Sequence, residues 1–192
     1  MLIAAYIVLA FAFGISNMVL FRRCAEVTPI RLSRGLVVTL FVAAVQTGLF
    51  LLGMLLGDLL RFELPTDGSA FSKTNALVFM GLDIFVMLRM LKPHLKRKPQ
   101  LPFFNLADNR ACLAMAFAIG INLLLVGLGA GFVASPVRDL HKAMWPLLLV
   151  MFLAGYWGLM LGRRKVAMRP RRWMVVAAVL LFGVGIAAVV NA

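Results

Sequence analysis

Residues 10–17 read A-F-A-F-G-I-S-N, and residues 116–122 read A-F-A-I-G-I-N. A second related pair follows in the same order, with G-M-L-L-G at residues 53–57 and G-L-M-L-G at residues 158–162. The members of each pair are about 105 residues apart. Two matches in the same order at nearly the same offset predict that the chain contains an internal repeat.

The sequence around these motifs is apolar in long blocks. Of its 192 residues, 63% are hydrophobic and 14% are charged. Blocks of about 20 apolar residues have the length that a helix needs to cross a bilayer, and irregular backbone is excluded at that depth. The chain is therefore predicted to be an all-α integral membrane protein with six transmembrane helices, at about residues 2–21, 36–57, 75–91, 111–133, 144–162 and 173–191.

Each half of the repeat contains three predicted helices, an odd number, so the second half enters the membrane upside down. This predicts two inverted three-helix repeats, at residues 1–92 and 111–192, joined by a cytoplasmic linker at residues 93–110. Inverted repeats are a recurring design of secondary transporters, which place the substrate site near the midplane where the halves meet.

The net charge of +13 is distributed unevenly along the chain. Three segments, 22–34, 89–110 and 163–172, hold sixteen of the twenty Lys and Arg residues. The positive-inside rule places these segments in the cytoplasm and both termini outside, as expected for a bacterial inner membrane. Topology and anionic lipid account for the charge, so no nucleic-acid partner is expected. Because basic residues follow the first span and none precedes it, we interpret it as a retained helix and not a signal peptide.

Cysteine and histidine give no sign of a metal centre or an enzyme. Cys24 and Cys112 are expected near the reducing cytoplasmic side, so no disulfide is predicted. His94 and His141 are predicted to lie in opposite loops, where they cannot meet. No nucleotide-binding loop, catalytic set or zinc-protease motif is present in the sequence. We therefore expect no enzymatic activity and no cofactor.

Asp83 is the one ionisable residue that the sequence places deep in a predicted span. A carboxylate there costs about 2.5–3.5 kcal/mol on insertion scales, and such residues usually mark a transport path or a proton relay. Two structural alternatives remain open. The carboxyl can be protonated and hydrogen-bonded to another helix, or it can form an ion pair with Arg89.

Three primary amides also lie within predicted spans: Asn17, Gln46 and Asn122. They can serve as hydrogen-bonding contacts between helices, or they can line a substrate path with Ser16 and Thr47 as secondary members. The two asparagines occupy similar places in the two repeats, which favours the second interpretation, since inverted repeats bring such places together.

Glycines spaced along the predicted helices give small faces for close helix approach, and these faces permit a homodimer. They include Gly53, Gly57, Gly158, Gly162 and the run Gly127, Gly129 and Gly131.

These motifs resemble those of the bacterial manganese-efflux pump family (MntP) of the lysine-exporter superfamily. Residues 12–17 resemble the first-helix motif, in which a serine lies just before an Asp. Residues 44–57 are similar to a second-helix motif, in which A-V-E-T leads into two glycines, and residues 118–129 to a fourth-helix motif with S-L-D-A. The resemblance implies six helices, two repeats, both termini outside and efflux of Mn²⁺.

The chain departs from this family at its acidic positions. Asn17, Gln46 and Asn122 are the amides of the expected acids, and Asp83 lies where the family usually has a basic residue. Mn²⁺ favours hard oxygen ligands, and amides supply no countercharge. Export against an inside-negative potential also needs an energy source. Proton exchange would need a titratable group, and Asp83 is the only candidate.

The leading hypothesis is a manganese exporter in which these four residues line a midplane site and also ligate the metal. The first alternative is an exporter of a neutral or zwitterionic solute on the same scaffold, which amide hydrogen bonding suits better. The second is a non-transporting membrane subunit that has kept the fold.

Overall fold

The computed structural model describes residues 3–28, 30–60, 68–95, 103–133 and 136–191, and for residues 68–71 and 136–139 it describes the backbone alone. Arg61 and residues 96–102 of the predicted linker lie outside this part. The described chain forms six helices: α1 (Ile3–Val27), α2 (Leu32–Leu59), α3 (Gly68–Leu95), α4 (Asn109–Val133), α5 (Pro136–Arg163) and α6 (Pro170–Val190).

All six helices are long and apolar enough to cross a membrane. The shortest is α6, whose 21 residues extend about 30 Å at 1.5 Å per residue, the thickness of a bilayer's hydrocarbon core. Large apolar side chains also project outward from the bundle, among them Phe11, Leu52, Phe117 and Val179. Six such helices are typical of a multi-pass membrane protein, and their outer surface is compatible with lipid contact.

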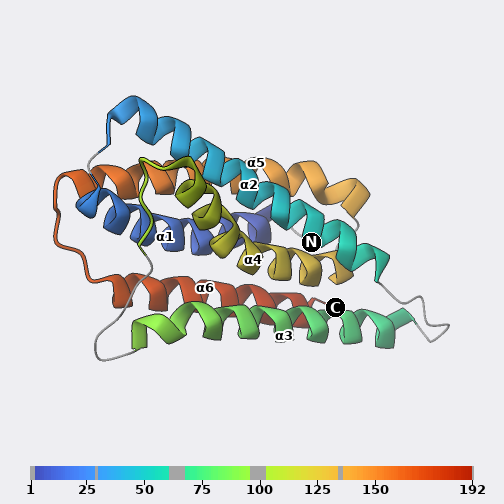
Figure 1. Cartoon of the computed structure of the whole chain (residues 1–192). Helices are drawn as coiled ribbons and strands as arrows, with labels where there is room; N and C mark the ends of the chain where they lie inside the picture. Colours follow the sequence, from blue (N-terminus) through green and yellow to red (C-terminus); the bar gives the residue numbers. More distant parts are fainter. Residues whose placement is uncertain (1–2, 29, 61–67, 96–102, 134–135, 192) are drawn as a thin grey trace.

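Each helix packs mainly against two others, so the six helices form a closed ring in the order α1, α5, α2, α4, α3, α6. In Figure 1, α3 and α6 lie side by side along the bottom, and the other four helices lie above them. Helices α1 and α2 are adjacent in sequence but are separated by α5 in the ring. Side chains that join α1 to α2 therefore cross the interior.

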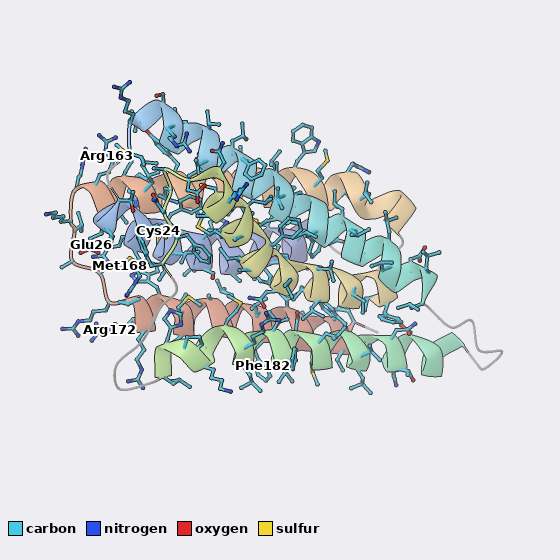
Figure 2. The ribbon with its side chains drawn as sticks, in the orientation of Figure 1. Cys24, Glu26, Arg163, Met168, Arg172 and Phe182 are labelled. Atoms are coloured by element: carbon cyan, nitrogen blue, oxygen red, sulfur yellow. The ribbon has the colours of Figure 1, made fainter. Side chains whose placement is uncertain are left out.

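The chain runs back and forth between the two ends of the bundle. Helices α1, α3 and α5 finish at the left end in Figure 1, where α2, α4 and α6 begin, and both termini lie towards the other end. Arg163 and Arg172 mark the left end in Figure 2. The described residues of the three basic segments thus gather at one end, which we call the basic end.

The two closest helix pairs are α2 with α4 and α1 with α5, and glycines make them possible. A Cβ atom added to Gly53 would collide with the Leu124 carbonyl, and one added to Gly131 would collide with the Met54 carbonyl. On the other pair, Gly158 meets the backbone of Met18. These contacts agree with the expectation that the spaced glycines serve close helix approach.

Each of the six helices extends beyond its predicted span at one end at least, most of all α3 and α5. Helix α3 continues to Leu95 with Pro93 inside it, and α5 starts at Pro136. His94 and His141 therefore lie in helices, so their predicted placement in loops is wrong. Hydropathy marks only the apolar part of a helix, whereas the hydrogen-bonded backbone runs on through polar residues at its ends. The two histidines still lie at opposite ends of the bundle. Helices α3 and α5 finish at the same end, and His94 lies near the end of α3 whereas His141 lies near the start of α5.

A short segment before α4 is held tightly at the basic end. The Arg34 guanidinium on α2 donates to the Leu106 carbonyl (3.2 Å), the Ala107 carbonyl (2.6 Å) and Oδ1 of Asn109 (2.8 Å). The Leu106 side chain is fully buried in a cluster with residues of α1, α2 and α4. This packing positions Phe104 against the interior.

Candidate functional site

Asn17 and Gln46 form a reciprocal amide pair inside the ring. Asn17 Nδ2 donates to Gln46 Oε1 at 2.6 Å, and Gln46 Nε2 donates to Asn17 Oδ1 at 3.0 Å. Both side chains are fully buried. Each amide satisfies the other, so the pair connects α1 with α2 across the interior and offers little capacity for a ligand.

Asp83 lies elsewhere, on the buried face of α3 that packs against α6. Its side chain is 1% exposed, and neither carboxyl oxygen has a hydrogen-bond partner. A Cβ atom added to Gly185 of α6 would lie 3.5 Å from Asp83 Oδ2. Within the described chain Asp83 therefore has neither the ion pair with Arg89 nor the hydrogen bond to another helix that a purely structural role would give it.

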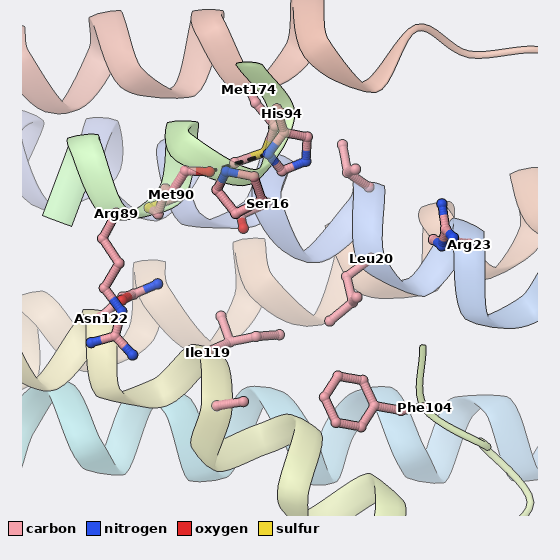
Figure 3. A pocket seen from close by; sticks show the side chains of 13 residues that line it. Ser16, Leu20, Arg23, Arg89, Met90, His94, Phe104, Ile119, Asn122 and Met174 are labelled. Atoms are coloured by element: carbon pink, nitrogen blue, oxygen red, sulfur yellow. Dashed lines mark hydrogen bonds between the residues drawn. The ribbon is translucent and has the colours of Figure 1, made fainter. Parts of the chain in front are cut away.

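A partly open cavity of about 290 Å³ lies near the basic end, and Arg89 and Ala118 in its wall are exposed. Helices α1, α3, α4 and α6 and the segment before α4 all contribute to its wall. The lining side chains are Ser16, Val19, Leu20, Arg23, Arg89, Met90, Pro93, His94, Phe104, Ala118, Ile119, Asn122 and Met174. Figure 3 shows these side chains around it. Its volume is at the lower end of the range for small-molecule sites.

The structure brings only part of the predicted site to this cavity. Asn122 and Ser16 line it, whereas Asn17 does not, although it is adjacent to Ser16. Neighbouring residues on a helix point about 100° apart, so Ser16 faces the cavity while Asn17 faces α2. Thr47 is buried on α2 with an unpartnered hydroxyl, away from the lining. The predicted site residues thus lie in separate places and do not line one common cavity.

Three buried polar atoms of the lining residues have no hydrogen-bond partner: Arg23 Nε, His94 Nε2 and Asn122 Oδ1. The other ring nitrogen of His94, Nδ1, lies 3.1 Å from the Met90 carbonyl. A carbonyl only accepts, so Nδ1 carries the proton in that contact and Nε2 is left unpaired. Unsatisfied buried polar atoms are uncommon, and several around one cavity favour a polar occupant.

The charge of the cavity is positive. Arg23 and Arg89 carry permanent guanidinium charges, and no Asp or Glu is among the described residues that line it. In the described part of the chain there is also no group of three or more His, Cys, Asp or Glu side chains able to hold a metal ion. A divalent cation entering the cavity would meet two guanidinium groups without a countercharge.

Sequence reasoning missed Arg23, Arg89, His94 and Phe104 as lining residues, because all four fall in segments interpreted as loops or as topology signals. One signal pointed to His94. It follows Asp83 by eleven residues, three helical turns, so the two share a face of α3 once the helix is known to continue. No comparable signal in the sequence links Phe104 to the interior.

Comparison with protein-family models, with curated proteins and with solved structures finds no match to this chain.

Proposed function

We propose that this chain is a multi-pass membrane transporter that exports a small polar solute through the cavity beside Asn122. The observation that carries the proposal is a positively charged cavity with unpartnered polar atoms, lined by helices whose outer surfaces are apolar. A helix bundle that served only as a scaffold would gain nothing from leaving these atoms unsatisfied, since each one costs free energy.

The helix contacts support two inverted repeats. If α1, α2 and α3 correspond to α4, α5 and α6, then the α1–α5 contact corresponds to the α4–α2 contact. By the same rule, α3–α4 corresponds to α6–α1, and α2–α5 and α3–α6 correspond to themselves. All six main contacts of the ring obey this exchange, as a two-fold axis in the membrane plane requires.

Glycine contacts support one register for the proposed repeat. Gly53 meets the carbonyl of Leu124, and its counterpart Gly158 meets that of Met18. Leu124 then corresponds to Met18, so Asn122 corresponds to Ser16 and not to Asn17. This register replaces the expected pairing of the two asparagines. It supports the cavity as the site, because Asn122 and Ser16 both line it.

The basic end supports an orientation with that end in the cytoplasm and both termini outside, in a bacterial inner membrane. In this orientation the cavity lies towards the cytoplasm, where an exporter loads its substrate. No enzymatic step, cofactor or nucleic acid is part of the proposal.

Manganese export, which the family resemblance implies, is the second candidate, and it depends on Asp83. The carboxyl is buried with two unpartnered oxygens, which suits a group that binds an ion or a proton in passing. The charge of the cavity opposes it, because Mn²⁺ would pass Arg23 and Arg89. A polar solute without positive charge is therefore the better candidate.

Inside-out membrane vesicles test both candidates at once, because export becomes uptake in this preparation. Vesicles with the native chain are incubated with a defined mixture of organic acids, amino acids, sugars and MnCl₂, and their contents are measured by mass spectrometry. We expect accumulation of a polar solute that Asn122→Leu abolishes and Arg164→Gln, an exposed control at the same end, retains.

Accumulation of manganese alone, lost in Asp83→Asn, would favour the second candidate instead. If no component accumulates although the protein is present in the membrane, the transport proposal fails and a non-transporting subunit remains.

A further inference from the structure

Arg89 and Asn122 both line the cavity. In Figure 3 the Arg89 side chain reaches from α3 towards Asn122 on α4. Arg23 lies on the other side of the cavity, with Ser16 and Ile119 between. In this view one guanidinium group lies on either side of the cavity, and the Asn122 amide is drawn next to that of Arg89.

The Arg89 guanidinium is free to take an anion. Its side chain is accessible, and no acidic group of the described residues forms an ion pair with it, whereas Arg22 pairs with Glu26 at 3.5 Å. A guanidinium presents its N–H groups as a planar fork that matches the two oxygens of a carboxylate. The second guanidinium, on Arg23, adds positive potential and excludes cations.

Asn122 requires a hydrogen-bond donor from the ligand, whereas Arg89 requires an acceptor. Its Oδ1 atom is buried without a partner, and an amide oxygen only accepts hydrogen bonds. A ligand that pairs with Arg89 through an acceptor must therefore also offer a donor nearby. His94 Nε2, unpartnered in the same wall, increases this polar capacity.

Resting on the transport function above, we propose that the cavity binds a short hydroxycarboxylate, whose carboxylate accepts hydrogen bonds from Arg89 and whose hydroxyl donates to Asn122 Oδ1. An amino acid also offers a carboxylate and a donor, but its ammonium group would meet two arginines and no acid among the described lining residues. A phosphate dianion needs more hydrogen-bond donors than the one guanidinium group beside Asn122 supplies. The volume of about 290 Å³ fits a molecule of a few carbon atoms.

Ligand binding to the purified full chain in lipid nanodiscs tests this site without a transport assay. The shift in unfolding temperature is measured with millimolar sodium lactate, against sodium chloride at equal ionic strength. Parallel samples contain propionate, glycine, phosphate, glycerol or MnCl₂. We expect lactate to stabilise the protein most, and propionate, which lacks the hydroxyl, to stabilise it less.

Two variants assign the binding to the proposed atoms. Arg89→Gln removes the guanidinium, and Asn122→Asp places a negative charge at the hydroxyl position with almost no change in shape. Arg89→Gln is expected to weaken lactate binding at least about tenfold, because it removes a charge-assisted hydrogen bond. Asn122→Asp is also expected to weaken it at least about tenfold, because its carboxylate repels that of lactate. Arg164→Gln removes the same charge from an exposed position and should bind lactate as the native chain does.

Unfolding without ligand, measured for every variant, shows that a loss of binding is not a loss of fold. Stabilisation by glycine, phosphate or MnCl₂ but not by lactate would overturn the hydroxycarboxylate assignment, and so would unchanged lactate binding in Arg89→Gln. If lactate binds as expected but no solute enters the vesicles, the site stands and the transport function fails. If a different solute is transported and lactate does not bind, transport stands and this inference fails.

Discussion

Asn17 and Gln46 satisfy each other's amide groups across the interior of the helix ring, through hydrogen bonds of 2.6 and 3.0 Å. Both residues are the amides of carboxylates expected from the family resemblance. Two carboxylates at this distance would repel unless a cation or a proton lay between them. Two amides need neither, so the polar groups of this part of the interior are satisfied without a ligand.

The pair should behave as a unit when it is mutated. In the proposed repeat register, Leu123 and Met151 correspond to Asn17 and Gln46 of the first repeat, and both are buried. Asn17→Leu or Gln46→Met alone leaves one buried amide unsatisfied and should lower the free energy of unfolding by about 1–3 kcal/mol. The double variant removes both amides and should recover most of the loss. Unfolding in detergent measures this coupling, and simply additive losses would contradict the pairing.

Asp83 should be dispensable for stability. Both oxygens lack partners, so Asp83→Asn removes a costly buried carboxyl and breaks no contact. We expect an unfolding temperature equal to or above that of the native chain. Glu26→Gln, an exposed acid on α1, is the matched control and should change the free energy of unfolding by less than about 0.5 kcal/mol. A loss of more than about 1 kcal/mol in Asp83→Asn would reveal a partner for the carboxylate.

Glycine substitutions should separate the close helix contact from the outer surface. Gly131→Ala places a methyl group against the Met54 carbonyl and should cost at least about 1–3 kcal/mol, since backbone cannot move aside as a side chain can. Gly48 of α2 has open space where its Cβ would lie, so Gly48→Ala should be neutral or stabilise the helix by up to about 1 kcal/mol. The temperature of unfolding in detergent compares the two. Equal effects would mean that α2 and α4 do not touch at Gly131.

Arg34 should control how tightly the segment before α4 packs. Arg34→Gln removes the contacts of this side chain with Leu106, Ala107 and Asn109. Cys112 can report the change, because its thiol lies 3.6 Å from the Leu106 carbonyl. Cys112 is 3% exposed and should react slowly with thiol reagents in the native chain. In a Cys24→Ala background, Arg34→Gln should raise this labelling rate several-fold.

The exposed neighbour Arg31 provides the control for this experiment. Arg31→Gln should leave the labelling rate of Cys112 unchanged. Equal rates in Arg34→Gln and in the native chain would show that the segment does not depend on the guanidinium.

Much of the fold follows from the sequence, because hydropathy and helix length report directly on long apolar helices. All six were predicted, and the helix ends erred where polar residues continue a helix, as at His94. The sequence also singled out Asn17 and Gln46 as buried polar residues. It does not give their partnership, because α1 and α2 are not ring neighbours and only the packing shows which side chains cross the interior.

The cavity was predicted only through Asn122 and Ser16. Arg89 and His94 were counted as part of a basic loop, since charge alone does not distinguish a side chain in a loop from one on a helix that lines a cavity. The two asparagines were paired across a one-residue gap, whereas the ungapped match of residues 10–15 with residues 116–121 places Ser16 opposite Asn122. The contacts of Gly53 and Gly158 support that ungapped register.

The central claim is that the cavity beside Asn122 is a transport path, and cysteine accessibility tests it whatever the substrate is. Asn122→Cys is placed in a background without Cys24 and Cys112, in sealed vesicles of both orientations, and treated with a membrane-impermeant thiosulfonate. A transporter that alternates between its two faces should be labelled from both sides of the membrane, with Leu147→Cys in the buried core as the unlabelled control. Protection of Asn122→Cys from both sides, or labelling from one side only, would contradict a transport path through this cavity.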